Sequence, residues 1–203
     1  EVAVQKQHPE FSIRDLDYDD PDTYKMLGQG DTEGVFQLES SGMKQVLVGL
    51  QPQNLEDVIA LISLYRPGPM DSIPIYLRNR HEPDKISYKT PQLAHILDVT
   101  NGCIVYQEQV MQIFRELAGF SFGQADNVRR AMSKKKHAVM EAEREHFVHG
   151  CTEPGHECPG CVANGIPEQV ANQIYDEMSS FASYAFNKSH AACYAYVAFQ
   201  TAY

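Results

Sequence analysis

Residues 181–196 constrain the fold of this chain more than any other stretch; they read Phe-Ala-Ser-Tyr-Ala-Phe-Asn-Lys-Ser-His-Ala-Ala-Cys-Tyr-Ala-Tyr. The side chain of Asn187 or Ser189 can accept a hydrogen bond from a backbone N–H, and the alanines that follow favour a helix. A helix start carries unpaired N–H groups and the positive end of the helix dipole. The sequence therefore predicts a helix that begins at about Ser189.

The start of this helix carries groups that suit an anion. Lys188 and His190 flank it with a cation and a titratable donor, and Tyr184 supplies a ring that can stack on a planar ligand. Phosphate is the usual occupant of such a helix start. The alternative is that the segment is scaffold, with Tyr194, Tyr196 and Phe199 in the core.

Apolar residues recur at helical spacing through the rest of the chain, which predicts a mainly α-helical, irregular fold with few or no strands. Asp20 before Pro21 predicts a capped helix that ends at Gly28 or Gly30. Between residues 70 and 98 we expect loops with short helices. The other expected helices are 34–50 with a break at Gly42, 55–64 with Asn54 as its cap, 104–117, 124–147 and 167–181.

Length and composition indicate a folded piece of a larger protein. The chain has 203 residues and is 43% hydrophobic, which is enough for one substantial core or two small ones. It contains no apolar stretch that could span a membrane and no signal peptide, so we expect no membrane partner and a cytoplasmic location. Because it starts at Glu1 and the last helix runs to Tyr203, an excised fragment is expected.

Charge is distributed unevenly. The net charge of −10 argues against a simple basic nucleic-acid coat, but residues 129–136 contain no acid and concentrate five cations. These cations are Arg129, Arg130, Lys134, Lys135 and Lys136. In one continuous helix Arg130 and Lys134 would point away from the side of Arg129, unless the helix breaks near Ser133. Two interpretations of these five cations remain open: they bind phosphate groups, or they form a solvent-exposed face of a helix.

The cysteines suggest a metal. Three of the five cysteines lie between Cys151 and Cys161, and in a cytosolic chain such a cluster indicates metal before disulfide. We expect a small Cys/His insertion over residues 148–166 with a structural Zn²⁺ on Cys151, His156, Cys158 and Cys161. The alternative is a flexible loop of reduced cysteines. Cys103 and Cys193 are expected to be buried apolar residues.

Several long segments, in order, resemble one protein family. They are residues 34–40 (Gly-Val-Phe-Gln-Leu-Glu-Ser), 65–70 (Tyr-Arg-Pro-Gly-Pro-Met), 106–111 (Tyr-Gln-Glu-Gln-Val-Met), 129–136 (Arg-Arg-Ala-Met-Ser-Lys-Lys-Lys) and 184–192 (Tyr-Ala-Phe-Asn-Lys-Ser-His-Ala-Ala). The chain resembles the alpha subunit of bacterial DNA polymerase III, the C-family replicative polymerase, over nearly its whole length. The matching part of that family is the fingers domain, so residues 1–203 are expected to be one fingers fragment.

The resemblance implies roles for the candidate residues. Arg129, Arg130, Lys188 and His190 would contact the triphosphate of an incoming deoxynucleotide, and Tyr184 would lie against its base or sugar. The three lysines 134–136 would face DNA phosphates or solvent. For Arg66 and Gln109 the sequence assigns no contact, because both segments have a structural explanation as a rigid turn and a helix entry.

The resemblance also implies what the fragment lacks. A polymerase needs two metal ions held by carboxylates, and in this family the palm domain supplies the carboxylates for Mg²⁺. No segment here resembles the palm motif, and the acidic residues between Asp15 and Asp22 are interpreted as a solvated loop. We therefore expect no catalytic residue in this chain. The parent would be a DNA-directed DNA polymerase whose partners are template-primer DNA, deoxynucleoside triphosphate and other replisome subunits.

Two other classes of function compete with this interpretation. One is a non-catalytic helical nucleic-acid-binding module with a zinc knuckle, and the other is a structural helical domain that docks partners. A fingers fragment predicts binding that depends on the triphosphate, whereas the module predicts nucleic-acid binding indifferent to free nucleotide.

Overall fold

The computed structural model describes residues 1–134, 137–182, 184 and 186–203. The chain divides into two compact units, one of residues 1–62 with 189–203 and the other of residues 63–188. Across the described residues the structure is helical, and its only β-pairing consists of isolated bridges. The prediction of a mainly α-helical fold with few or no strands is therefore confirmed, whereas the single fingers fragment over 1–203 and the insertion over 148–166 stay predictions.

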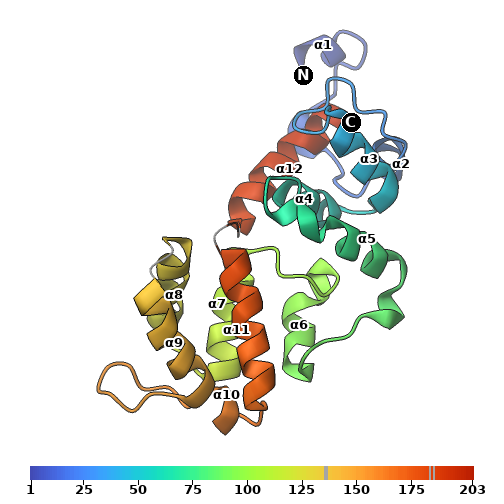
Figure 1. The fold of residues 1–203 in the computed structure, drawn as a ribbon. Helices are drawn as coiled ribbons and strands as arrows, with labels where there is room; N and C mark the ends of the chain where they lie inside the picture. Colours follow the sequence, from blue (N-terminus) through green and yellow to red (C-terminus); the bar gives the residue numbers. More distant parts are fainter. Residues whose placement is uncertain (135–136, 183, 185) are drawn as a thin grey trace. The chain divides into compact units, whose positions relative to one another are not determined.

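The first unit is built from short helices near the start of the chain and from most of the last helix. In chain order these elements are α1 Val2–Gln5, the 3-10 turn Ile13–Asp15, α2 Pro21–Gly28, α3 Ser41–Leu50, α4 Leu55–Leu64 as far as Ile62, and α12 Lys188–Ala202 from Ser189 onward (Figure 1). Aromatic side chains join α2 to α12, since the ring centroids of Tyr24 and Phe199 lie 5.3 Å apart. Both rings are buried, so this contact forms part of the unit's core.

Two helix starts of the first unit follow the predicted capping. Asp20 Oδ2 accepts a 2.8 Å hydrogen bond from the Thr23 N–H, with Pro21 at the first helical position. Asn54 Oδ1 accepts a 3.0 Å bond from the Asp57 N–H at the start of α4. The expected helix over 34–50 is too long, because Gly34 and Gln37 have positive φ and α3 begins only after Ser40.

The second unit contains the remaining elements. They are the 3-10 turn Pro69–Ser72, α5 Ile73–His81, the 3-10 turns Pro83–Lys85 and Pro91–Leu93, α6 Ala94–Leu97, the 3-10 turn Asp98–Thr100, α7 Gln107–Ala118, α8 Phe122–Ser133, α9 His137–His149, α10 Gly160–Ala163 and α11 Glu168–Ala182. Helices α7, α8, α9 and α11 pack on one another (Figure 1). The predicted loops with short helices between residues 70 and 98 are confirmed.

An aromatic cluster fills the centre of the second unit. Phe114 of α7 lies 5.0 Å from Phe147 of α9 and 6.0 Å from Tyr175 of α11, measured between ring centroids, and all three side chains are fully buried. The Tyr175 hydroxyl donates a 2.6 Å hydrogen bond to the Met140 carbonyl, so its polar end is satisfied. This cluster fixes α7 against α9 and α11, and α7 in turn carries much of the candidate site.

The expected single helix over residues 124–147 is wrong. Helix α8 ends at Ser133 with Lys134 as its C-cap, and α9 begins at His137. Met132 at the end of α8 and Phe147 near the end of α9 are both buried in the same core. Helices α8 and α9 also pack against each other, which two halves of one straight helix cannot do, so the helix is interrupted after Ser133.

Candidate nucleotide-binding site

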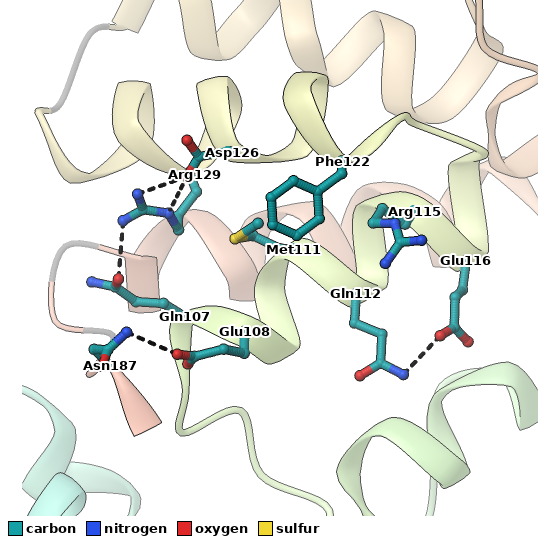
Figure 2. A pocket seen from close by; sticks show the side chains of 10 residues that line it. All are labelled: Gln107, Glu108, Met111, Gln112, Arg115, Glu116, Phe122, Asp126, Arg129 and Asn187. Atoms are coloured by element: carbon teal, nitrogen blue, oxygen red, sulfur yellow. Dashed lines mark hydrogen bonds and ion pairs between the residues drawn. The ribbon is translucent and has the colours of Figure 1, made fainter. Parts of the chain in front are cut away.

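One pocket of the second unit gathers residues from α7, from α8 and from the segment just before α12. Its volume is about 490 Å³. Its lining residues are Gln107, Glu108, Met111, Gln112, Arg115, Glu116, Phe122, Asp126, Arg129 and Asn187. Figure 2 shows the polar contacts at one end, the side chains of Met111 and Phe122 in the middle, and Gln112 and Glu116 at the other end. Arg129 and the residue before Lys188 therefore line the same pocket.

Arg129 lies at the polar end of the pocket and is held by two neighbours. Its Nε and Nη2 donate to Asp126 Oδ1 over 3.0 and 2.8 Å, and its Nη1 donates to Gln107 Oε1 over 2.9 Å (Figure 2). The hydrogen bonds from Arg129 lower the pKa of the Asp126 carboxyl, so this group stays ionised. The forked donors of arginine suit a phosphate as well as they suit a carboxylate.

The other cations of the basic run are placed differently. Arg130 Nη2 lies 2.7 Å from Asp126 Oδ2, and its side chain is 64% exposed. Asp126 therefore pairs with both arginines at once. Lys134 is exposed at the C-cap of α8. The expectations for Lys135 and Lys136 lie outside the described residues.

A carboxylate occupies the start of α12. Glu108 Oε1 and Oε2 each accept from the Lys188 N–H at 3.2 Å, and Glu108 Oε1 accepts from Asn187 Nδ2 at 2.9 Å. The Lys188 ammonium lies 5.3 Å from the centroid of the Tyr106 ring. The predicted helix start is confirmed within one residue, and it does attract an anionic group, which in this structure belongs to the protein.

Two contacts bring Glu108 to this position. Tyr106 and Phe186 form a parallel bridge, in which the Gln107 N–H donates a 2.9 Å hydrogen bond to the Phe186 carbonyl. The buried side chain of Gln109 accepts from the N–H groups of Val105 and Tyr106 at 2.9 and 3.0 Å. Together they fix the first turn of α7 beside the residues that lead into α12.

Tyr184 lines another pocket of the second unit, of about 420 Å³, together with Gly68. Gly68 has a φ of +100°, and a Cβ atom on it would lie 2.6 Å from the Tyr184 ring. Arg66 Nη2 donates a 2.7 Å hydrogen bond to the Tyr184 carbonyl, and its guanidinium lies 4.0 Å from the centroid of the Phe186 ring. Burial lowers the pKa of Arg66. Arg66 and Gly68, to which the sequence assigned no ligand contact, thus position the segment that carries Tyr184.

His190 belongs to the first unit. Its ring lies 4.6 Å from the ring of Tyr194, centroid to centroid, and the residue is exposed. The Tyr194 ring also lies 5.5 Å from that of Phe36. His190 follows Lys188 by two residues along α12.

The predicted zinc ligands are not gathered in this structure. Cys151 and Cys158 form an antiparallel bridge with two 2.9 Å hydrogen bonds, and His156 is exposed in the turn between them. Burial raises the pKa of the Cys161 thiol to about 12 and also raises that of Cys158. Through the described part of the chain, no group of three or more His, Cys, Asp or Glu side chains could hold a metal ion.

The other two cysteines differ from each other. Cys103 is buried, as expected, and burial raises its pKa to about 11. Cys193 is exposed, so the prediction that it is buried is wrong. The spacing on α12 explains the difference: Ala191, Ala195 and Ala198 face the core of the first unit, and Cys193 lies on another face of the helix.

Sequence reasoning missed two acidic residues of this site, Asp126 and Glu108. Asp126 had a local signal, because residues three and four positions apart on a helix are neighbours and its partners are Arg129 and Arg130. Glu108 had none, since its partner Lys188 is 80 residues away in the sequence.

None of the described helices is both long enough and apolar enough to span a membrane.

Comparisons with known proteins agree with the resemblance seen in the sequence. The family model described as bacterial DNA polymerase III alpha subunit finger domain matches residues 1–155. DNA polymerase III subunit alpha of Thermus aquaticus is 49% identical over all of this chain, which covers 16% of that protein. The proteins of the same name from Staphylococcus epidermidis (strain ATCC 12228) and Staphylococcus aureus (strain Mu50) are each 46% identical over 95% and 93% of the chain, which covers 17% of each.

The chain thus spans about a sixth of the length of these relatives. The family model covers well over half of the chain, and the relatives agree with it in name. This chain belongs to the family of the bacterial DNA polymerase III alpha subunit finger domain.

Proposed function

We propose that this chain is the fingers part of a replicative DNA polymerase and that it binds the incoming deoxynucleoside triphosphate and part of the template-primer. The observation that carries the proposal is the pocket lined by both Arg129 and Asn187, because it joins the arginine end of α8 to the start of α12. Arg129 in the pocket and Lys188, the residue directly after Asn187, suit a polyanion with several phosphate groups. The relatives are named as polymerase subunits, which supports the same class of ligand.

The roles follow from the chemistry of each group. Arg129 and Arg130 would bind triphosphate oxygens through their forked donors, and Lys188 and His190 would add charge there. Tyr184 would lie against the base or the sugar. The lysines Lys134, Lys135 and Lys136 would contact DNA phosphates or solvent, where they affect affinity for DNA and its salt dependence.

The chemical step itself would take place in the parent polymerase, meaning the full-length protein that we expect to contain this chain. Its palm domain would hold Mg²⁺, which activates the primer 3′-hydroxyl and stabilises the leaving group. The parent would work in the cytoplasm with other replisome subunits. The isolated chain should not extend a primer, and extension by the purified chain with magnesium would contradict the proposal.

We also propose that residues 151–161 bind one structural zinc ion through Cys151, His156, Cys158 and Cys161. The bridge between Cys151 and Cys158 supports this, because it makes these two residues cross-strand neighbours. Elemental analysis of protein purified without chelator should give about one zinc per chain. The Cys158→Ser variant should lose it and the Cys193→Ser variant should keep it. Protein without zinc would reject the site and leave the nucleotide proposal untouched.

Arg129→Ala in the parent polymerase tests the nucleotide proposal. A charge-assisted hydrogen bond is worth about 1.5–3 kcal/mol, so kcat/KM for the incoming nucleotide should fall roughly 10- to 150-fold. Affinity for template-primer should change little. Lys134→Ala is the matched control from the same basic run, and it should leave the nucleotide dependence unchanged.

Steady-state kinetics with varied nucleotide at saturating primer would make this measurement. Unchanged nucleotide dependence in Arg129→Ala would overturn the proposal. Binding of DNA that is indifferent to nucleotide in both the variant and the unmodified protein would instead favour a non-catalytic nucleic-acid-binding module.

A further inference from the structure

Both cationic elements of the pocket already hold a carboxylate. At α8, Asp126 accepts from Arg129 through two nitrogens and pairs with Arg130 at 2.7 Å. At the start of α12, Glu108 accepts from the Lys188 N–H and from Asn187 Nδ2. The proposed function assigns Arg129, Arg130 and the charge of Lys188 to the triphosphate. The Lys188 N–H and Asn187 Nδ2 belong to the same helix start as that charge.

From these contacts we propose that Asp126 and Glu108 are internal counter-ions, which the triphosphate must displace when it binds. This inference rests on the proposed function and adds positioning residues to it. The two carboxylates hold the donors in place when no nucleotide is bound, and phosphate oxygens take over their hydrogen bonds when the nucleotide arrives.

The geometry at α8 supports such an exchange. Asp126 accepts from Nε and Nη2 of Arg129, which form one of the guanidinium edges that can bind a phosphate through two parallel hydrogen bonds. Gln107 Oε1 accepts from Nη1. A phosphate can therefore reach the edge formed by Nε and Nη2 only by replacing Asp126 there.

The exchange at Asp126 is feasible because water can reach the carboxylate that leaves. The side chain of Asp126 is 21% exposed and that of Arg130 is 64% exposed, so both groups can regain water when their pairing changes. A fully buried ion pair would instead leave an uncompensated charge on separation.

At the start of α12 a carboxylate also accepts hydrogen bonds from the donors, but its bonds to Lys188 are longer than those between Asp126 and Arg129. The two hydrogen bonds from Lys188 N–H to Glu108 are each 3.2 Å long, near the upper end of the range for N–H···O bonds. Glu108 is exposed and lies in the first turn of α7. The N–H groups and the dipole at the start of α12 attract an anion, but Glu108 already accepts from the Lys188 N–H, so an incoming anion must displace it.

Removing the charge of a counter-ion should therefore tighten nucleotide binding. In the parent polymerase, Asp126→Asn and Glu108→Gln should each lower KM for deoxyadenosine triphosphate about two- to fivefold at low salt, the range expected for the loss of one exposed ion pair. The turnover number should stay the same, because the side chains leave the donors when the nucleotide is bound. The gain should shrink as salt is raised.

Glu116→Gln is the matched control. Glu116 is a carboxylate of the same pocket, but it accepts a 2.7 Å hydrogen bond from Gln112 and pairs with His95. Because its partners do not include the arginines of α8 or the start of α12, its substitution should leave KM unchanged. Inhibition by inorganic pyrophosphate gives a second measurement, and Asp126→Asn and Glu108→Gln should each strengthen it by a similar factor.

The outcomes separate this inference from the function on which it rests. Lower KM and stronger pyrophosphate inhibition in Asp126→Asn and Glu108→Gln, with Glu116→Gln unchanged, support the exchange. Unchanged or higher KM in both variants overturns the inference, even where Arg129→Ala behaves as proposed. An equal decrease in Glu116→Gln also overturns it, since the effect would then follow from the general charge of the pocket. Unchanged nucleotide dependence in Arg129→Ala overturns the proposed function itself.

Discussion

The end of α8 that carries Arg129 and Arg130 and the start of α12 both hold a carboxylate against hydrogen-bond donors, but the two carboxylates come from different parts of the sequence. Each presents donors that suit an anion, and each holds a carboxylate. At α8 the carboxylate of Asp126 comes from the same helix, three residues before Arg129 and four before Arg130. At α12 the carboxylate of Glu108 comes from a residue 80 positions away. The first arrangement is local in the sequence, whereas the second exists only once α7 and the segment before α12 have come together.

This difference predicts whether the pairs of Asp126 or the contacts of Glu108 survive a change elsewhere in the second unit. The Asp126 pairs should form wherever α8 forms, because helical spacing alone brings these residues together. The contacts of Glu108 depend on the bridge between Tyr106 and Phe186 and on the buried side chain of Gln109. Changes in the core beneath α7 should therefore disturb the start of α12 and leave the arginines of α8 paired.

The largest effect should come from Gln109→Ala. It removes the acceptor for the Val105 and Tyr106 N–H groups and the donor to Thr100 Oγ1 at 2.7 Å, in a residue that is 5% exposed. Since a buried polar group left without a partner costs about 1–3 kcal/mol, the free energy of unfolding of the second unit should fall by about 2–4 kcal/mol. Urea unfolding of the chain, followed by circular dichroism, would measure it.

Gln112→Ala is the control on the same helix. Its side chain donates a 2.7 Å hydrogen bond to the exposed Glu116. Its substitution should change the free energy of unfolding by less than about 0.5 kcal/mol. Similar losses in the two variants would show that the start of α7 is not fixed by Gln109, and the contrast between local and distant contacts would fail.

The same contrast explains what the sequence could predict about the fold. Helix α4 has the predicted bounds and Asp20 is the predicted cap of α2, because both follow from apolar spacing and from side chains within three residues. Apolar spacing predicts that α7 starts at residue 104, three residues before its observed start at Gln107. Residues 105 and 106 instead bond to Phe186 and Gln109, and neither of these partners can be read from local periodicity.

The residues of the candidate site also fall into those with a local signal in the sequence and those placed by distant contacts. Basic residues and a helix start near Lys188 were visible in the sequence, and Arg129 with the residue before Lys188 now lines one pocket. Tyr184 lines another pocket, and its support by Arg66 spans 118 residues, which no local pattern could indicate. Glu108 belongs to the same class of distant contact.

At α12, charge should matter more than capping. Lys188→Ala and His190→Ala in the parent polymerase should each lower kcat/KM for nucleotide roughly 10- to 150-fold, because each removes a donor expected at the triphosphate. Ser189→Ala removes a hydroxyl and no charge, so its effect should be smaller than that of Lys188→Ala. The same steady-state kinetics decide this point. Equal effects of Ser189→Ala and Lys188→Ala would mean that the helix start itself, and not its cation, determines nucleotide use.

The smallest effect should come from Asp126→Asn measured as stability. Asp126 pairs with Arg130, whose side chain is 64% exposed, and with Arg129 in a pair whose side chains are 20% and 21% exposed. Because water reaches all three side chains, we expect the pairs to contribute about 1 kcal/mol. The pKa of Asp126 is lowered in the folded chain, chiefly by its hydrogen bonds to Arg129. The contribution is therefore fully present above the ordinary carboxyl pKa of about 3.9 and is lost as pH falls through the lower folded-state value.

Urea unfolding of the unmodified chain and of Asp126→Asn, compared at neutral pH and at progressively lower pH, would test this prediction. The difference in free energy should be small at neutral pH, smaller in high salt, and absent once Asp126 is protonated. A loss above about 2 kcal/mol at neutral pH would be too large for ion pairs that remain accessible to water. Asp126 would then be a structural residue of α8. Its kinetic effect could no longer be ascribed to exchange with phosphate, and the counter-ion inference would rest on Glu108 alone.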